Sequence, residues 1–375
     1  MPLVRTIIQA LEAWAPAASA QSYDQVGLQV GRADQEIDRG LIALDLTEDV
    51  VQEAAAQGAQ VIITHHPLLF KPLRRVTPQD ASGHLVLKLA QADIAYYAIH
   101  TNLDAAHGGV SFALARQLGL EQVSFLAPEA STLCKLVVFV PLDHVDRVRE
   151  ALGQAGAGHL GAYAECAFTV QGTGTFRPLP QAQPFIGEAG GGLERVAEAR
   201  LETVVPRWSV QRAVAAMRAA HPYEEVAYDV YPVEQPTPNQ GLGAIGVLPE
   251  AEALPRFLSR VATALDTSIL RYVGADNAMV QRVAVCGGSG SSLIGQAKRA
   301  GADAYVTADI TYHSYFEALT PSGRPQMALV NAGHYETEAI TETLLVDWLT
   351  ERFPTVAWAR TQHRTSPVRS FVRDP

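Results

Sequence analysis

Short, almost wholly apolar runs alternate with amphipathic stretches along this chain. In residues 40–70, Leu41–Leu44 and Val61–Thr64 form two such runs, and Glu48–Gln57 between them has a helical pattern. Strands without polar alternation are typical of a parallel sheet that is buried on both faces, with a helix as the crossover. The first part of the chain is therefore predicted to be α/β.

The same plan returns in residues 282–309. The runs Val283–Val285 and Ala304–Thr307 flank a Gly/Ser turn and a predicted helix at Ser292–Ala300. This second βαβ pattern predicts an α/β region in the C-terminal part of the chain as well.

A weak internal repeat relates the two regions. Gly58–His66 and Gly301–Asp309 match in length and pattern, although chance similarity of two βαβ units explains the match equally well. If the repeat is real, the His65-His66 pair and Asp309 lie at equivalent strand ends. Because ligands bind at the carboxyl ends of strands in open α/β sheets, the two halves are expected to face each other across a cleft.

Residues 131–238 have a different texture, rich in glycine and closing on Pro232, Pro236 and Pro238. Strand-like and helix-like segments alternate here in β-α-β order: Leu136–Val140, Val145–Leu152, Phe168–Val170, Leu201–Val205, Val210–Ala220 and Ala227–Val230. This order predicts an inserted α+β domain of ferredoxin-like size with a proline-rich linker at its exit. The predicted organisation is an N-terminal lobe at 1–130, the insertion at 131–238 and a C-terminal lobe at 239–375.

Composition narrows the class of protein. The 375 residues, 48% hydrophobic and 18% charged, suffice for two or three globular domains. The net charge is −10 and no run of lysine or arginine offsets it, so a long nucleic acid is not an expected partner. Cys134, Cys166 and Cys286 are widely spaced, which argues against a disulfide framework and for buried thiols in a cytoplasmic protein.

No membrane partner is expected either. The apolar residues of Val4–Trp14 have helical spacing, but Glu12 interrupts them, so this segment is predicted to be an amphipathic helix rather than a secretory signal. Nowhere do about 18 apolar residues run unbroken, as a membrane span requires.

The first candidate metal ligands are His65 and His66, which follow the apolar run Val61–Thr64. Pro67 ends the strand and disfavours a helical backbone at His66. The bend allows two adjacent side chains, which would point to opposite faces within a strand, to serve one site. A single histidine here would more often be structural, but two in succession favour metal ligation.

A second predicted strand, Ile94–Ile99, ends in His100-Thr101-Asn102-Leu103-Asp104. Asp104 is a candidate ligand, although a helix N-cap is nearly as good an interpretation of the residue alone. His100 stays open between a ligand, a partner that orients a ligand, and a buried spectator.

His334 and Glu338 supply the third group of candidate ligands. They are four residues apart just before a predicted helix at Ala339–Trp348, so they share one helix face. For this pair alone, metal binding and a structural role are equally good interpretations.

Together the candidates comprise three imidazoles and two carboxylates. This set suits zinc, iron, manganese or cobalt better than calcium or magnesium, which prefer oxygen ligands. Five ligands exceed what one catalytic zinc usually takes, so two divalent ions that activate a bridging water are an attractive arrangement.

Two further motifs are less specific. Gly287–Ser292 lies between strand and helix and could cradle a phosphate, but its spacing is neither a P-loop nor a dinucleotide fingerprint, and a tight turn explains it equally well. Asp309 and His313, four apart, could act as acid and base, although a capped helix start would also explain Asp309.

These motifs resemble the Nif-three-like family, whose members are often named GTP cyclohydrolase 1 type 2 homologues. The resemblance rests on blocks in the same order over nearly the whole chain: Tyr23–Gly31, Ile63–Pro67, His100–Asp104, Thr307–Ile310 with Tyr312-His313, Gly333–Glu338, and His221–Glu225 within the insertion. Gln25 stands where the family usually has Asn, and Ala308 where it has Gly; both departures concern the substrate pocket.

The resemblance implies a two-lobed α/β body, an insertion similar to PII-like and CutA-like ferredoxin-like domains, and a ring-shaped homohexamer. It also implies a dinuclear metal centre at His65, His66, Asp104, His334 and Glu338. The leading hypothesis is a metal-dependent hydrolase of a small molecule such as GTP, with His100, Asp309 or His313 moving protons.

Two other hypotheses remain. One is a non-enzymatic metal-binding or regulatory protein in which the insertion senses a ligand. The other is a phosphoesterase or nucleotide-binding module that uses the Gly287–Ser292 turn.

Overall fold

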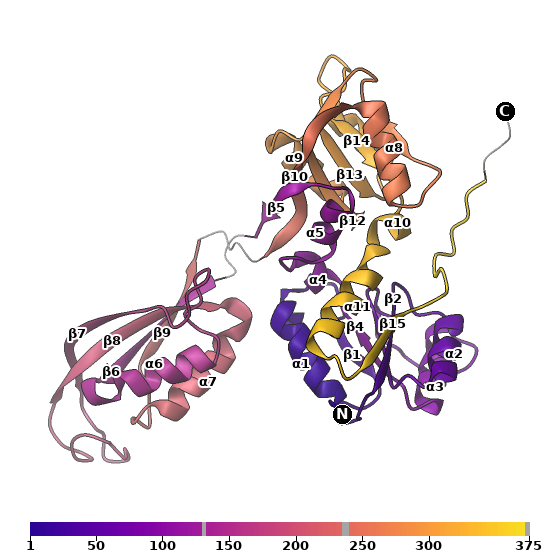
Figure 1. Ribbon diagram of the computed structural model, residues 1–375. Helices are drawn as coiled ribbons and strands as arrows, with labels where there is room; N and C mark the ends of the chain where they lie inside the picture. The colour runs from indigo at the N-terminus through magenta and orange to yellow at the C-terminus, as the bar shows by residue number, and fades with distance from the viewer. Residues whose placement is uncertain (130–132, 235–239, 372–375) are drawn as a thin grey trace. The chain divides into compact units, whose positions relative to one another are not determined.

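The structure is a computed structural model and describes residues 1–129, 133–234 and 240–371. The chain forms two compact units, one made of Met1–Pro128 with Asn239–Pro375 and the other of Glu129–Pro238 (Figure 1). The predicted boundaries at 130/131 and 238/239 lie outside the described residues, as do Pro236 and Pro238 of the predicted linker.

The first unit contains a five-stranded sheet in the order β1-β4-β3-β2-β15. Its neighbours are parallel except for the antiparallel pair β1–β4. The strands are β1 Gly27–Val30, β2 Arg39–Ala43, β3 Val61–Thr64, β4 Ala95–Ala98 and β15 Ala357–Arg360. All four residues of β3 and of β4 are buried, which agrees with their lack of polar alternation.

The crossover from β2 to β3 forms where the sequence predicts it. Helix α2 spans Glu48–Gln57, and the side chain of its N-cap, Thr47, accepts a hydrogen bond from the Val50 amide. Gly58 ends the helix in the left-handed conformation, with φ of 70°, which glycine adopts without steric cost. The two ends of α2 are thus fixed by Thr47 and Gly58, and the helix leads directly into β3, after which His65 and His66 follow.

A second, six-stranded sheet has the order β11-β14-β13-β12-β10-β5. Only β12–β13 and β13–β14 are parallel, so the centre has the predicted βαβ character while both edges are antiparallel. The strands are β5 Glu121–Pro128, β10 Gly241–Ala253, β11 Arg271–Val273, β12 Met279–Ser289, β13 Ala304–Ala308 and β14 Ala328–Asn331.

Each sheet takes an edge strand from the other half of the sequence: β15 pairs with β2, and β5 pairs with β10. Helix α5 packs on β12 and α11 packs on β2, and the two helices contact each other between the sheets (Figure 1). The helices of this unit are α1 Val4–Trp14, α2, α3 Ala81–Gln91, α4 Thr101–Ala105, α5 Val110–Gln117, α8 Leu254–Ala264, α9 Ile294–Arg299, α10 His334–Glu338 and α11 Ile340–Arg352, with 3-10 turns η1 Ala17–Ser19, η4 Ser291–Leu293 and η5 His313–Ala318.

The second unit has the element order β-α-β-β-α-β. Its four strands form an antiparallel sheet in the order β7-β8-β6-β9. Apolar side chains of β6 and β8 pack against both helices on one face of this sheet. The elements are β6 Leu133–Pro141, η2 Leu142–His144, α6 Val145–Gln154, β7 Ala167–Phe176, β8 Glu194–Pro206, η3 Arg207–Ser209, α7 Val210–Ala220 and β9 Tyr228–Val233.

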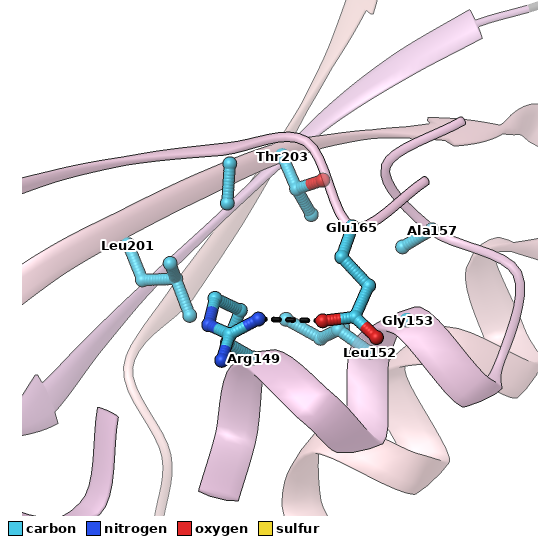
Figure 2. A pocket seen from close by; sticks show the side chains of 8 residues that line it. Arg149, Leu152, Gly153, Ala157, Glu165, Leu201 and Thr203 are labelled. Carbon is cyan, nitrogen blue, oxygen red and sulfur yellow. Dashed lines mark hydrogen bonds and ion pairs between the residues drawn. The ribbon is translucent and has the colours of Figure 1, made fainter. Parts of the chain in front are cut away.

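One gap near this helical layer is closed by an ion pair. Figure 2 shows Arg149 of α6 turned towards Glu165, and their side chains lie 2.5 Å apart. The space that they border, which Leu152 and Leu201 also line, is only about 10 Å³. At most one water fits such a volume, so the side chains around this gap are closely packed.

The cysteines match the sequence-based expectation only in part. All three are free, but only Cys134 is buried, while Cys166 and Cys286 are partly exposed. Cys166 follows a turn before β7, and Cys286 lies in β12 just before its glycines, where it packs against a core cluster.

A buried carboxylate on α11 gives the fold a pH dependence. Glu342 is 6% exposed and accepts a hydrogen bond from the Leu44 amide at the end of β2. Burial outweighs this bond and raises the pKa of Glu342 from 4.5 to about 7. The native state therefore holds a proton that the unfolded chain releases from about pH 4.5 upward, so the Glu342 contribution to stability falls as pH rises towards 7.

Glu342→Gln, which resembles the protonated side chain, is expected to remove this fall. The unfolding free energy of the variant minus that of wild type should grow by about 1–3 kcal/mol from pH 5 to pH 8. Urea unfolding of chelator-treated protein at both values measures it, with Glu351→Gln, an exposed carboxylate on the same helix, as the control. An unchanged difference between the two pH values in Glu342→Gln would contradict the assignment.

Candidate metal centre

Four imidazoles and two carboxylates meet in the first unit, where strands and a short helix end. His65 and His66 follow β3, His100 follows β4, and Asp104 lies in α4. His334 begins α10 and Glu338 ends it. Ring centroids of His65, His66 and His100 are 5.1–5.4 Å apart, and His334 lies 5.3 Å from His66.

The turn after β4 is fixed by Asn102. This buried side chain accepts a hydrogen bond from the His100 amide at 2.9 Å and donates one to the Ala15 carbonyl at 2.8 Å. The turn directs His100 and Asp104 to the same side. Asp104 is inside α4 rather than at its N-cap, which excludes the capping alternative.

Glu338 lies at the middle of the cluster and uses its two oxygens differently. Oε2 is 2.9 Å from Nε2 of His66 and 3.0 Å from Nε2 of His334. Oε1 is 3.8 Å from Nε2 of His65, which in turn is 3.6 Å from Oδ1 of Asp104. The carboxylate thus faces two separate sets of ligand atoms.

Each of the four rings is held at Nδ1 by an oxygen. The Ile99 carbonyl contacts His65 at 2.9 Å, Asp45 contacts His66 at 2.7 Å, Asp24 contacts His100 at 2.9 Å, and Asp309 contacts His334 at 2.7 Å. An oxygen acceptor places the proton on Nδ1 and leaves the Nε2 lone pair for a ligand. We assign the tautomers from these partners.

The cluster contains polar atoms that the protein itself does not satisfy. His65 is fully buried, and its Nε2 has no hydrogen-bond partner among the described residues. Oε2 of Glu338 is likewise buried, without a hydrogen bond of suitable geometry among those residues, although two imidazoles lie within 3.0 Å. Buried atoms of this kind are costly unless a ligand completes them, and a divalent cation suits nitrogen and carboxylate atoms.

Carboxylates of the cluster raise the pKa of two of its imidazoles. Burial lowers the pKa of His66, but Asp45 and Glu338 outweigh it and raise that pKa to about 10. Glu338 is also the main cause that raises the pKa of His334 to about 9. The carboxylates therefore attract positive charge to this place, in the form of protons or of a metal ion.

The glycine turn predicted as a tight turn or phosphate cradle lies against Glu338. The Gly288 amide donates a hydrogen bond to Thr337 Oγ1 at 3.0 Å, and the Gly288 carbonyl accepts one from Thr307 Oγ1 at 3.0 Å. A Cβ on Gly288 would collide with Oε1 of Glu338. The turn thus makes room for the central carboxylate, and its Gly288 amide already has a partner.

The structure brings most of the predicted site residues together. His65, His66, His100, Asp104, His334 and Glu338 lie in one cluster, and Asp309 contacts the far side of the His334 ring. His313 is exposed, and the ring contact described for it is with Tyr312. Sequence reasoning gave Asp45 no role and Asp24 only a place in a family motif; the position of Asp45 just after β2, like that of His65 after β3, was the available signal.

The fold and these side chains define an α/β protein with residues that could hold a metal ion. The model of the family Duf34/NIF3 (NGG1p interacting factor 3) matches residues 2–367, and the chain belongs to this family. Relatives named GTP cyclohydrolase 1 type 2 homolog include one from Bacillus subtilis, 45% identical over 90% of this chain and 89% of its own, and one from Mycobacterium tuberculosis, 40% identical over 88% and 87%.

A solved structure supports the fold. A Bacillus cereus protein related to NIF3 superposes with a TM-score of 0.81 at 42% identity, covering 99% of both chains. The mixed α/β fold predicted from the sequence is confirmed, as is the family. In the described part of the chain, no helix combines the length and apolar character of a membrane span.

Proposed function

We propose that this protein binds two divalent metal ions and is a metal-dependent hydrolase. The observation that supports two ions is the placement of Glu338, whose oxygens face His65 with Asp104 on one side and His66 with His334 on the other. Zinc, iron and manganese suit this mixture of imidazole and carboxylate ligands. Two such metal ions, when bound, would activate a water molecule for attack on the substrate.

The protein's own residues would orient the ligands and move protons. His100 is held by Asp24, whose side chain is buried and also accepts two hydrogen bonds from Thr101. With its Nδ1 fixed, His100 presents Nε2 to the centre and is our candidate proton carrier. The hydrogen bond of Asp309 to His334 supports a positioning role for that carboxylate, while proton transfer by His313 stays a prediction.

The proposed substrate is a small molecule. GTP is the first to test, because relatives are named GTP cyclohydrolase 1 type 2 homolog. We expect protein loaded with two equivalents of zinc, iron or manganese to turn over GTP, and chelation to stop the reaction, because the water needs the ions. Product formation followed by chromatography measures this. Absence of turnover by fully loaded protein with each metal would contradict the GTP assignment.

That negative result would favour a second function, a non-enzymatic metal-binding protein whose insertion senses a ligand. The element order and strand order of the insertion support a ferredoxin-like domain of the PII or CutA kind. A cavity of about 990 Å³ opens on its sheet, lined by Phe139, Phe176, Phe185, Arg200 and Tyr223 among others. This volume matches small-molecule sites. A homohexamer is likewise a proposal that rests on the family resemblance.

A further inference from the structure

The chain that follows β15 is anchored at two points. In residues 361–371, only Thr361 and Thr365 are buried. Thr361 donates a hydrogen bond to Glu53 of α2 at 2.5 Å, away from the candidate metal centre. Thr365 is 8% exposed and lies at the centre's edge. Threonines buried four residues apart in an otherwise exposed segment indicate a docked segment rather than a loose tail.

Thr365 reaches the metal centre through one intermediate side chain. Its Oγ1 donates a hydrogen bond to Oδ2 of Asp45 at 2.8 Å, and Oδ1 of the same carboxylate is 2.7 Å from Nδ1 of His66. Both oxygens of Asp45 are therefore engaged. A carboxylate held at both oxygens cannot rotate without breaking a hydrogen bond, so Thr365 fixes the plane in which Asp45 meets the imidazole.

The same segment also contacts helix α10, which carries His334 and Glu338. Arg364 lies over the ring of Tyr335 at 4.3 Å and forms an ion pair with Glu336 at 2.5 Å. Thr365 thus contacts Asp45, which follows β2 and holds His66, and Arg364 contacts the helix that supplies the facing ligands. A segment docked at this position can align His66 with the ligands on α10.

We propose that the C-terminal segment is a positioning element of the metal centre, in which Thr365 and Asp45 hold His66 in place for the ion shared with His334. The inference rests on the proposed two-metal function and concerns one of the two ligand sets. His65 and Asp104 lie outside this chain of contacts, because Nδ1 of His65 is held by the Ile99 carbonyl. Loss of the Thr365 hydrogen bond should therefore affect one ion and spare the other.

The test is a titration of the metal-free protein with Co²⁺, followed by its visible absorption. Wild type is expected to take two ions. Thr365→Val keeps the shape of the side chain but loses the hydrogen-bond donor. It should bind one ion about 10–100-fold more weakly and the other with unchanged affinity, because losing a group that hydrogen-bonds and orients a metal ligand usually costs this much. Thr365→Ser keeps the donor and should restore wild-type binding.

Thr361→Val is the matched control, because it alters the other buried threonine of the segment without touching Asp45. Asp45→Asn should weaken the same ion, and its effect should not add to that of Thr365→Val, since both act through one contact chain. Normal binding of both ions by Thr365→Val, or equal weakening by Thr361→Val, would overturn the inference. Failure of wild type to bind a second ion would instead overturn the two-metal proposal.

Discussion

Glu338→Gln is expected to lose both metal ions. The neutral amide removes the negative charge that faces His66 and His334, and it places an NH2 group where one carboxylate oxygen now points. Because both ligand sets share this one side chain, the affinity for both ions should fall by more than about 100-fold. This exceeds the usual cost of losing a group that only hydrogen-bonds to a metal ligand. Competition with a coloured chelator measures the two affinities, and any turnover of GTP should fall with them.

Glu351→Gln provides the control for this experiment. It removes the same charge from an exposed position on α11, so metal binding should match wild type. Retention of one ion at wild-type affinity in Glu338→Gln would show that Glu338 belongs to a single ligand set. It would thereby contradict the bridging placement on which the two-metal proposal depends.

Local signals in the sequence were enough for the elements that carry the ligands. Helix α2 and strand β3 have the predicted bounds, because Thr47, Gly58 and an unbroken apolar run are strong local markers. Helix α7 also has its predicted bounds. Strands β7 and β8 are much longer than predicted, because they form an antiparallel ladder whose polar and glycine residues carry no apolar pattern.

The contacts behind the ligands depend on pairs far apart in sequence. Asp45 and Thr365 are 320 residues apart, and His334 lies 25 residues from Asp309. The sequence around a threonine or an aspartate does not predict which distant residue it will hydrogen-bond. The exchange of β5 and β15 between the sheets is hidden for the same reason, since an edge strand can pair with any complementary edge.

Asp309 illustrates how one residue can be placed correctly and given another role. The comparison of Gly301–Asp309 with Gly58–His66 predicted that both strand ends reach one site, and the structure brings Asp309 and His66 to opposite sides of His334. The sequence could not distinguish a proton carrier from an orienting carboxylate, because the distinction depends on which ring nitrogen the carboxylate meets. The repeat itself stays a prediction.

Gly288→Ala is expected to abolish metal binding while the protein still folds. The added Cβ would collide with Oε1 of Glu338, the end of a flexible side chain that can turn away at little cost in packing. Once displaced, the carboxylate no longer lies between His65 and His66. Gly288 also has φ of 59°, where alanine costs about 1–2 kcal/mol, so a modest loss of stability accompanies the loss of metal.

Gly301→Ala separates these two effects. Gly301 has φ of 68°, and an added Cβ there meets no atom within 4 Å, so only the backbone strain remains. Both variants should lose about 1–2 kcal/mol of unfolding free energy in chelator, measured by urea unfolding. Only Gly288→Ala should lose metal, measured by the same chelator competition as Glu338→Gln. Wild-type metal affinity in folded Gly288→Ala would mean that the glycine turn does not make room for the central carboxylate.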